Sequence, residues 1–155
     1  MATMPAAMAA KVPAGLERME TGLGPPARQR TVTPAQRDQK ETAVFHLTRG
    51  RTFVDARRDR EAIEELRRAI YLAPYEDEPH LLLGRVYLRA GRVSEAIDEF
   101  KVALWSKETA AAHVALGSAL LDQGDKAAAR KEADRALVLA PDQAEARDLV
   151  RRIGN

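Results

Sequence analysis

Residues 78–104 of the chain, EPHLLLGRVYLRAGRVSEAIDEFKVAL, decide the fold. Apolar and small residues recur here every three or four positions, both before and after a break at Ala90-Gly91-Arg92. Such spacing places these side chains on one face of a helix, and a glycine in the middle of the stretch marks a turn. The stretch therefore predicts two amphipathic helices joined by a tight turn.

The composition of the whole chain also favours a helical globular domain. Its 155 residues are 45% hydrophobic and 31% charged, and they include only three Phe, three Tyr and one Trp. A composition rich in Ala and Leu and poor in aromatic residues favours helix over strand. No apolar run reaches the roughly 18 residues of a membrane-spanning helix, and we read no secretory signal. The absence of cysteine excludes disulfides and thiolate metal sites. We take a cytoplasmic location as the default.

The net charge of +2 is unevenly distributed along the chain. Residues 1–40 hold six basic and three acidic residues, a net +3, whereas residues 41–155 hold 19 and 20, a net −1. The basic character thus belongs to the N-terminal segment. A charge of +3 is a weak electrostatic signal, so it gives little support to nucleic-acid binding through this segment.

Residues 1–32 are predicted to be a flexible or partner-docked tail. Seven Pro and Gly residues interrupt this segment too often for a long helix. Leu16, Met19 and Leu23 nevertheless share one helical face. Two interpretations stay open: a transient helical turn, or a docking segment that folds on a partner or in this chain's own groove.

Helix start and stop signals divide the remaining chain into seven helices. Thr33 with Gln36 and Asp142 with Glu145 are predicted capping boxes, and Thr109 and Asp125 are further predicted N-caps. The predicted helices begin near residues 34, 59, 77, 94, 109, 125 and 142 and end near residues 57, 73, 90, 105, 123, 140 and 153. No segment alternates with a period of two, so no strand is expected.

The helices follow an internal repeat. Gly50, Gly84 and Gly117 are 34 and 33 residues apart, and units that start at Ala43, Asp77 and Ala110 align with one another. Equivalent positions hold His46, His80 and His113; Ala62, Ala96 and Ala129; and Ala69, Ala103 and Ala136. Small residues let two helices approach closely, while the large residues fill the gaps between units. One unit cannot bury its apolar face alone, so the repeat predicts a stack.

This pattern resembles the tetratricopeptide repeat over residues 43–142. The residues that carry the resemblance are His80, Leu83-Gly84, Tyr87, Ala96, Phe100 and Ala103. The resemblance implies an all-α solenoid within residues 33–155, with helix-turn-helix repeats at about 43–76, 77–109 and 110–142 and a capping helix at 142–153.

Three features depart from the family pattern. Arg49 stands where the family has Leu, and Arg57 replaces the turn glycine found at Gly91 and Gly124. Either the first helix runs on past Arg57, or its turn is strained. The second unit is one residue short and lacks the closing Pro, so its junction with the third unit is irregular.

The residues offer no catalytic or metal-binding constellation. The three histidines occupy equivalent places on successive helices, which pack about 8–10 Å apart, and zinc needs its nitrogens at about 2.0–2.1 Å. We interpret these histidines as packing residues and expect no metal or cofactor. Carboxylates such as Glu64-Glu65 lie beside Arg67-Arg68, which is typical of solvated helix faces. We do not expect an enzyme.

The resemblance implies that the first helices of the units line a concave groove that binds a peptide. The corresponding residues are Leu47, Arg51, Val54, Asp55, Leu81, Arg85, Leu88, Arg89, Val114, Ser118, Leu121 and Asp122. Some of these apolar residues can equally pack against neighbouring helices. Chaperone-binding members of the family clamp a C-terminal carboxylate with Lys and Asn, which Leu47 and Arg51 do not match. An apolar floor with an arginine rim suits an amphipathic helix or a peptide with acidic residues.

A non-catalytic interaction scaffold or adaptor is therefore the expected function. The alternative is a structural accessory subunit of a larger assembly, held through the tail and through Tyr71 and Trp105. These two aromatic residues share one unit position that is usually polar. They are either exposed contact residues or covers for the unit junctions.

Overall fold

The computed structural model describes residues 31–154, and every regular element in that range is an α-helix. The helices are α2 (Pro34–Asp55), α3 (Asp59–Leu72), α4 (Asp77–Arg89), α5 (Val93–Ser106), α6 (Ala110–Asp122), α7 (Lys126–Leu139) and α8 (Ala144–Ile153). The all-α prediction is confirmed. None of these helices is long and apolar enough to cross a membrane.

The chain divides into two compact parts, Met1–Gln36 and Arg37–Asn155. The described end of the N-terminal part contains the predicted capping box. The Thr33 amide donates to Gln36 Oε1 at 3.0 Å, and the Gln36 amide donates to Thr33 Oγ1 at 3.2 Å. The predicted docking residues Leu16, Met19 and Leu23 lie outside the described residues.

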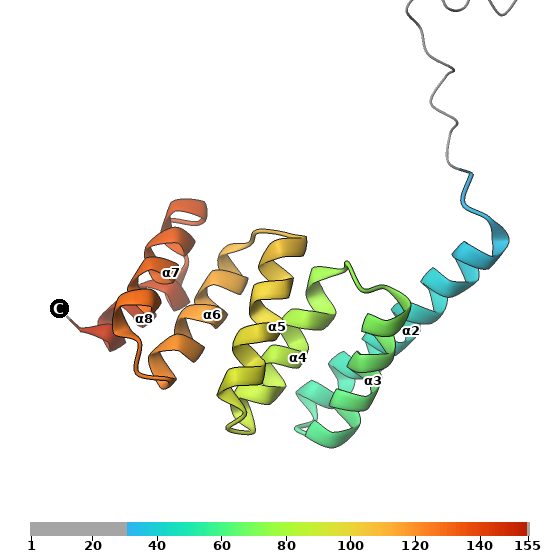
Figure 1. The fold of residues 1–155 in the computed structure, drawn as a ribbon, viewed down its shortest axis with the longest axis horizontal. Helices are drawn as coiled ribbons and strands as arrows, with labels where there is room; N and C mark the ends of the chain where they lie inside the picture. Colours follow the sequence, from blue (N-terminus) through green and yellow to red (C-terminus); the bar gives the residue numbers. More distant parts are fainter. Residues whose placement is uncertain (1–30, 155) are drawn as a thin grey trace, which may run out of the picture. The chain divides into compact units, whose positions relative to one another are not determined.

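In the C-terminal part, Arg37–Asn155, the helices pack as successive antiparallel hairpins, one for each repeat unit (Figure 1). In each hairpin, the two helices approach each other closely at a glycine of the first helix. A Cβ atom added at Gly84 would lie 2.4 Å from the ring of Phe100, and one at Gly50 would lie 2.7 Å from Leu66 Cδ2. In the third unit the position equivalent to Phe100 is Ala133, which is too small to fill the gap.

The C-terminal helix supplies the missing volume in the third unit. A Cβ added at Gly117 would lie 2.7 Å from Leu149 Cδ2, so Leu149 of α8 occupies the place that Phe100 takes in the second unit. Leu149 and Ile153 form a buried cluster with Ala129 and Ala133 of α7. The residues on the other face of α8 are exposed: Arg147, Asp148, Arg151 and Arg152. The helix thus closes the core and presents a polar outer surface, as a cap must.

The turn of the first unit is strained. Helix α2 ends at Asp55, so it does not run on past Arg57. Arg57 takes a left-handed backbone conformation with φ of 58°, where Gly91 and Gly124 have φ of 76° and 93°. A residue with a Cβ atom adopts this conformation at a cost of about 1–2 kcal/mol. The missing glycine therefore lowers stability without changing the helix–turn–helix path.

Two of the three other predicted caps are confirmed and one is wrong. Thr109 and Asp125 accept hydrogen bonds from the Ala112 and Ala128 amides. Asp142 does not cap α8, which begins at Ala144 without a side-chain cap. The amide of Gln143 bonds to the carbonyl of Ala140, which closes a turn around Pro141–Asp142 and delays the helix. The Asp142 carboxylate instead lies 3.2 Å from Arg147 Nη2.

Candidate functional site

A hollow of about 350 Å³ lies between α4, α6 and the start of α8. Its lining residues are Arg85, Leu88, Phe100, Ala111, Val114, Ala115, Ser118, Gln143 and Glu145. Arg85 and Leu88 are three residues apart on α4, and Val114 and Ser118 are four apart on α6, so each pair shares a helix face. The structure therefore brings four of the predicted groove residues to one place. We call this hollow the groove.

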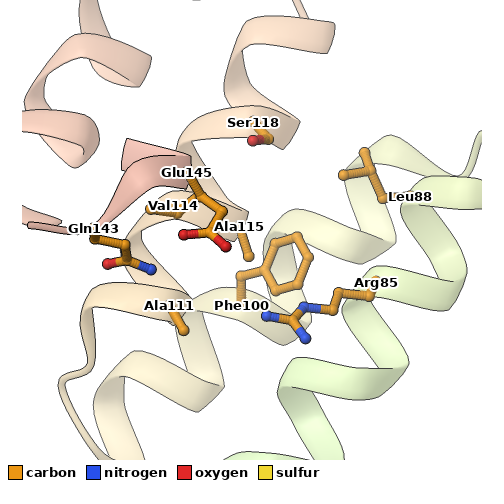
Figure 2. A pocket seen from close by; sticks show the side chains of 9 residues that line it. All are labelled: Arg85, Leu88, Phe100, Ala111, Val114, Ala115, Ser118, Gln143 and Glu145. Carbon is orange, nitrogen blue, oxygen red and sulfur yellow. The ribbon is translucent and has the colours of Figure 1, made fainter. Parts of the chain in front are cut away.

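The groove has an apolar floor between two opposite charges. Figure 2 shows the Arg85 guanidinium reaching into it from α4 and the Glu145 carboxylate from the facing side, with Phe100 between them. The amide oxygen of Gln143 is buried and accepts no hydrogen bond from the described residues. A buried acceptor without a donor costs about 1–3 kcal/mol.

The other two predicted rim arginines are engaged within the protein. Arg51 binds Glu78 in a fork, with Nε at 2.6 Å from Oε1 and Nη2 at 2.5 Å from Oε2. The hydrogen bond to Glu78 raises the pKa of Arg51 above its ordinary value. Arg89 is paired in the same way with Asp59 of α3. Among residues 31–154, Arg85 is therefore the one groove-lining arginine that no carboxylate neutralises.

The remaining predicted groove residues lie outside this hollow. Leu47 lines a second hollow of about 170 Å³, together with Lys40, Ala43, Val44, Ala69, Ala73, Glu76 and Pro79. Val54 and Leu81 are half-buried against the core, which is the packing role left open by the sequence. Leu121 packs against the cluster of α7 and α8, and Asp122 lies 3.9 Å from Arg152. Asp55 is exposed at the end of α2.

Sequence reasoning missed the part of the groove that α8 provides. The final helix was expected only to cap the stack, so Gln143 and Glu145 were not predicted as groove residues. The helical period was the available signal. Leu149 faces inward, and Glu145 lies one turn before it on an adjoining face. A capping helix whose first turn adjoins the last groove helix necessarily contributes polar residues to that end of the groove.

Each histidine binds a glutamate of its own unit, a pairing the sequence analysis did not identify. Nδ1 of His46, His80 and His113 lies 2.7, 2.7 and 2.5 Å from a carboxylate oxygen of Glu65, Glu99 and Glu132. The two partners are 19 residues apart in every unit, and this constant spacing was the available signal. Within residues 31–154, no group of three or more potential metal ligands exists. The histidines therefore join the first helix of a unit to the second.

Tyr71 and Trp105 are 85% and 75% exposed, so they do not cover the unit junctions. The sequence had left both possibilities open for this pair. Trp105 lies beside a third exposed aromatic residue, Tyr75, with ring centroids 5.9 Å apart. None of the three lines the groove. They form a separate surface feature that includes the ends of α3 and α5.

The stacked hairpins and the groove along their first helices define an α-solenoid of the helical-repeat class. The sequence model of the tetratricopeptide repeat matches residues 47–109 and 104–144, so the chain belongs to the tetratricopeptide repeat family. No curated protein sequence matches the chain.

Solved structures show the same fold. The tetratricopeptide domain of OM64 from Arabidopsis superimposes with a TM-score of 0.72 at 17% identity, covering 74% of this chain and 96% of that domain. The second such domain of human RPAP3, solved with the HSP70 peptide SGPTIEEVD, gives 0.70 at 20% identity, covering 77% and 98%. YrrB, described as having an unusual peptide-binding site, gives 0.66 at 23% identity, covering 77% and 62%.

Proposed function

We propose that the chain is a non-catalytic adaptor that binds a peptide segment of a partner protein in the groove. The observation that carries the proposal is the open Arg85 guanidinium beside an apolar floor. An apolar side chain of the peptide packs on Leu88 and Val114, and an acidic residue beside it pairs with Arg85. Charge-assisted bonds from arginine to a carboxylate are among the strongest polar contacts, especially where both donors of the fork are used.

The polar groups at the α8 end give the bound peptide a direction. Glu145 faces the groove opposite Arg85. A peptide whose acidic residue lies at Arg85 therefore places neutral or basic residues towards Glu145. An acidic residue at both ends is disfavoured by repulsion from Glu145. The expected ligand is thus acidic at one end only.

Relatives of the same fold support a peptide ligand. The human RPAP3 domain was solved with a peptide that ends in Glu-Glu-Val-Asp. That ligand carries acidic residues next to the apolar residues Ile and Val, which is the combination that we propose for the groove here. We nevertheless do not propose the same peptide for this chain. Arg51 is paired with Glu78 and is not free to bind a peptide carboxylate.

The experiment is a selection of random displayed peptides on the immobilised full-length chain. Selected peptides are then titrated against Arg85→Glu, Glu145→Lys and the control Arg60→Glu, in which an exposed arginine of α3 outside the groove is changed. We expect Arg85→Glu to weaken binding about tenfold or more, because it replaces attraction by repulsion at a half-enclosed site.

Glu145→Lys should shift the selected sequences towards acidic residues at both ends, while Arg60→Glu should leave binding unchanged. NMR amide shifts of the wild-type chain locate the peptide independently, and Leu88, Val114 and Ser118 should move. Peptides that bind Arg85→Glu as well as the wild type, or that shift none of these three residues, would overturn the proposal.

A further inference from the structure

Three exposed aromatic side chains lie outside the groove. Tyr71 at the end of α3, Tyr75 in the following turn and Trp105 at the end of α5 are 85%, 74% and 75% exposed. Aromatic side chains of this kind bury about 150–250 Å² each when covered. We call Tyr71, Tyr75 and Trp105 the aromatic face.

The aromatic face follows the repeat. Tyr71, Trp105 and Val138 hold the same position in the three units, on α3, α5 and α7, and Val138 is 69% exposed. Single exposed apolar residues are normal on a protein surface. Here the exposed residues recur at one position of successive units, so they form a row across the second helices of the units. Tyr75 adds to this row through its contact with Trp105. A ligand that binds two units at once can therefore use it.

Basic side chains accompany the aromatic face. Arg67 and Arg68 lie one turn before Tyr71, while Lys101 lies one turn before Trp105 and Lys107 lies just after it. Arg68 binds Glu65, but Arg67 donates only to the neutral hydroxyl of Tyr87 at 2.8 Å. Among residues 31–154, Lys101 and Lys107 form no ion pair within 4 Å. Arg67, Lys101 and Lys107 are therefore free to bind the carboxylates of a ligand.

A hollow adjoins the N-terminal end of this row. It has a volume of about 420 Å³, and its lining residues are Thr42, His46, Arg67, Arg68, Tyr71 and Leu72. An acidic side chain of a ligand can enter beside the two arginines while a neighbouring apolar side chain covers Tyr71. Arginine and aromatic residues together are the composition that binding surfaces favour.

We propose that the aromatic face is a second docking surface, which binds an acidic amphipathic segment of a partner protein. Leu, Phe or Trp side chains of the partner cover Tyr71 and Trp105, and its carboxylates pair with Arg67, Lys101 and Lys107. The surface and the groove are lined by different residues, so both can be occupied at once. This inference does not depend on a peptide in the groove.

Carboxylates on the same surface favour a protein partner over an anionic membrane. Glu64 and Asp98 are exposed on α3 and α5, each seven residues before an aromatic residue of the face, and Glu76 follows Tyr75 directly. A flat layer of anionic headgroups would lie against these carboxylates as well as against the lysines. A protein segment can place its own acidic residues only where the cations are.

The single tryptophan of the chain makes the test direct. Random displayed peptides are selected in parallel on the immobilised full-length chain and on its Trp105→Ser variant. Peptides that bind only the wild type are then synthesised. The binding of those without tryptophan is followed by Trp105 emission, which should shift to shorter wavelength as the ring leaves water. Fluorescently labelled copies of the same peptides are titrated against Tyr71→Ser, Lys101→Glu, Arg85→Glu and Phe45→Ser, the last being an exposed aromatic residue of α2 that serves as a matched control.

We expect selected peptides rich in Leu, Phe or Trp and in Asp or Glu. They should bind Tyr71→Ser and Lys101→Glu about tenfold more weakly or worse, and bind Arg85→Glu and Phe45→Ser as they bind the wild type. Because all these residues are exposed, unchanged circular dichroism and melting temperature of each variant should accompany the loss.

Three results would overturn the proposal. The first is a selection in which no peptide distinguishes the wild type from Trp105→Ser, or in which those that do are basic. The second is flotation of the wild type with phosphatidylserine vesicles that is lost in Trp105→Ser, which would assign the surface to a membrane. The third is a dimer in sedimentation that Trp105→Ser abolishes, which would assign it to a second copy of the chain.

Discussion

His80 of α4 binds Glu99 of α5 through Nδ1 at 2.7 Å, while its Nε2 lies 3.0 Å from the carbonyl oxygen of Pro74. A carboxylate and a carbonyl oxygen can only accept, so both ring nitrogens of His80 donate. The geometry therefore describes a protonated imidazolium. It joins three successive segments, namely the end of the first unit and both helices of the second.

Stability should fall with rising pH because of this arrangement. Burial by itself would lower the pKa of His80, but the hydrogen bonds to Glu99 and Pro74 and the charge of Glu99 together raise it above 6.5. A raised pKa in the folded state gives stability that is complete below the unfolded value and is lost as pH rises through the folded value. We expect the free energy of unfolding, from urea titrations, to decrease as the pH rises above the unfolded value of 6.5.

The variant His80→Gln isolates this contribution. Glutamine can still donate one hydrogen bond but does not titrate, so the decrease over the same pH range should be smaller than in the wild type. The comparison of slopes cancels other titrating groups, which both proteins share. An identical slope in the two proteins would show that His80 is neutral when folded.

Acid sensitivity should depend on Glu108, at the irregular junction between the second and third units. Arg135 donates to Glu108 at 2.6 and 3.0 Å and His113 at 3.0 Å. These hydrogen bonds, that of Arg135 first, lower the pKa of Glu108 from 4.5 to about 2. The stabilisation is present above the unfolded pKa of 4.5 and disappears as pH falls towards 2.

Urea titrations of Glu108→Gln should show this window. The variant should be less stable than the wild type at about pH 6 and should approach the stability of the wild type near about pH 2.5. A constant difference between Glu108→Gln and the wild type at all pH values would contradict the prediction.

The register of the repeat is predictable from the sequence because small residues recur at fixed positions of each unit. Glycine at Gly84 and alanine at Ala96 have one structural role each, and their recurrence fixes which helix faces meet. The same register places Arg85 and Ser118 in the groove, since a helix presents a fixed face. Whether an arginine is paired with a carboxylate cannot be predicted in the same way. Arg51 and Arg89 are neutralised by Glu78 and Asp59 of neighbouring helices, which depends on side-chain rotamers that no local pattern specifies.

Replacing the strained residue in the first turn should stabilise the domain. Arg57 has φ of 58°, whereas glycine occupies the equivalent places in the other two units. Glycine reaches this conformation without a clash, although it gains freedom in the unfolded chain. We expect Arg57→Gly to raise the free energy of unfolding by about 1 kcal/mol. Arg60→Gly, in the first turns of α3, should lower it by a similar amount. Equal effects of the same sign would show that the backbone strain at Arg57 is not real.

The close approach of the two helices in the second unit should make Gly84 intolerant of any side chain. A Cβ at this position would lie 2.4, 2.6 and 3.0 Å from Cε1, Cδ1 and Cζ of the buried Phe100 ring. The ring is rigid, so the helices must separate, and we expect Gly84→Ala to cost about 1–3 kcal/mol. Gly50→Ala should cost less, because its contacts with Cδ2 and Cγ of Leu66, at 2.7 and 2.9 Å, are less tight.

The same contact predicts a favourable coupling between two destabilising changes. Phe100→Leu removes ring atoms and leaves space close to Gly84, so the methyl group of Gly84→Ala fits there. The double variant should therefore be more stable than the sum of the single losses by about 1 kcal/mol, measured in a double-mutant cycle of urea titrations. Gly50→Ala with Phe100→Leu is the matched control and should be additive, because the two sites belong to different hairpins. Additive losses in Gly84→Ala with Phe100→Leu would mean that the Phe100 ring does not limit how closely α4 and α5 approach.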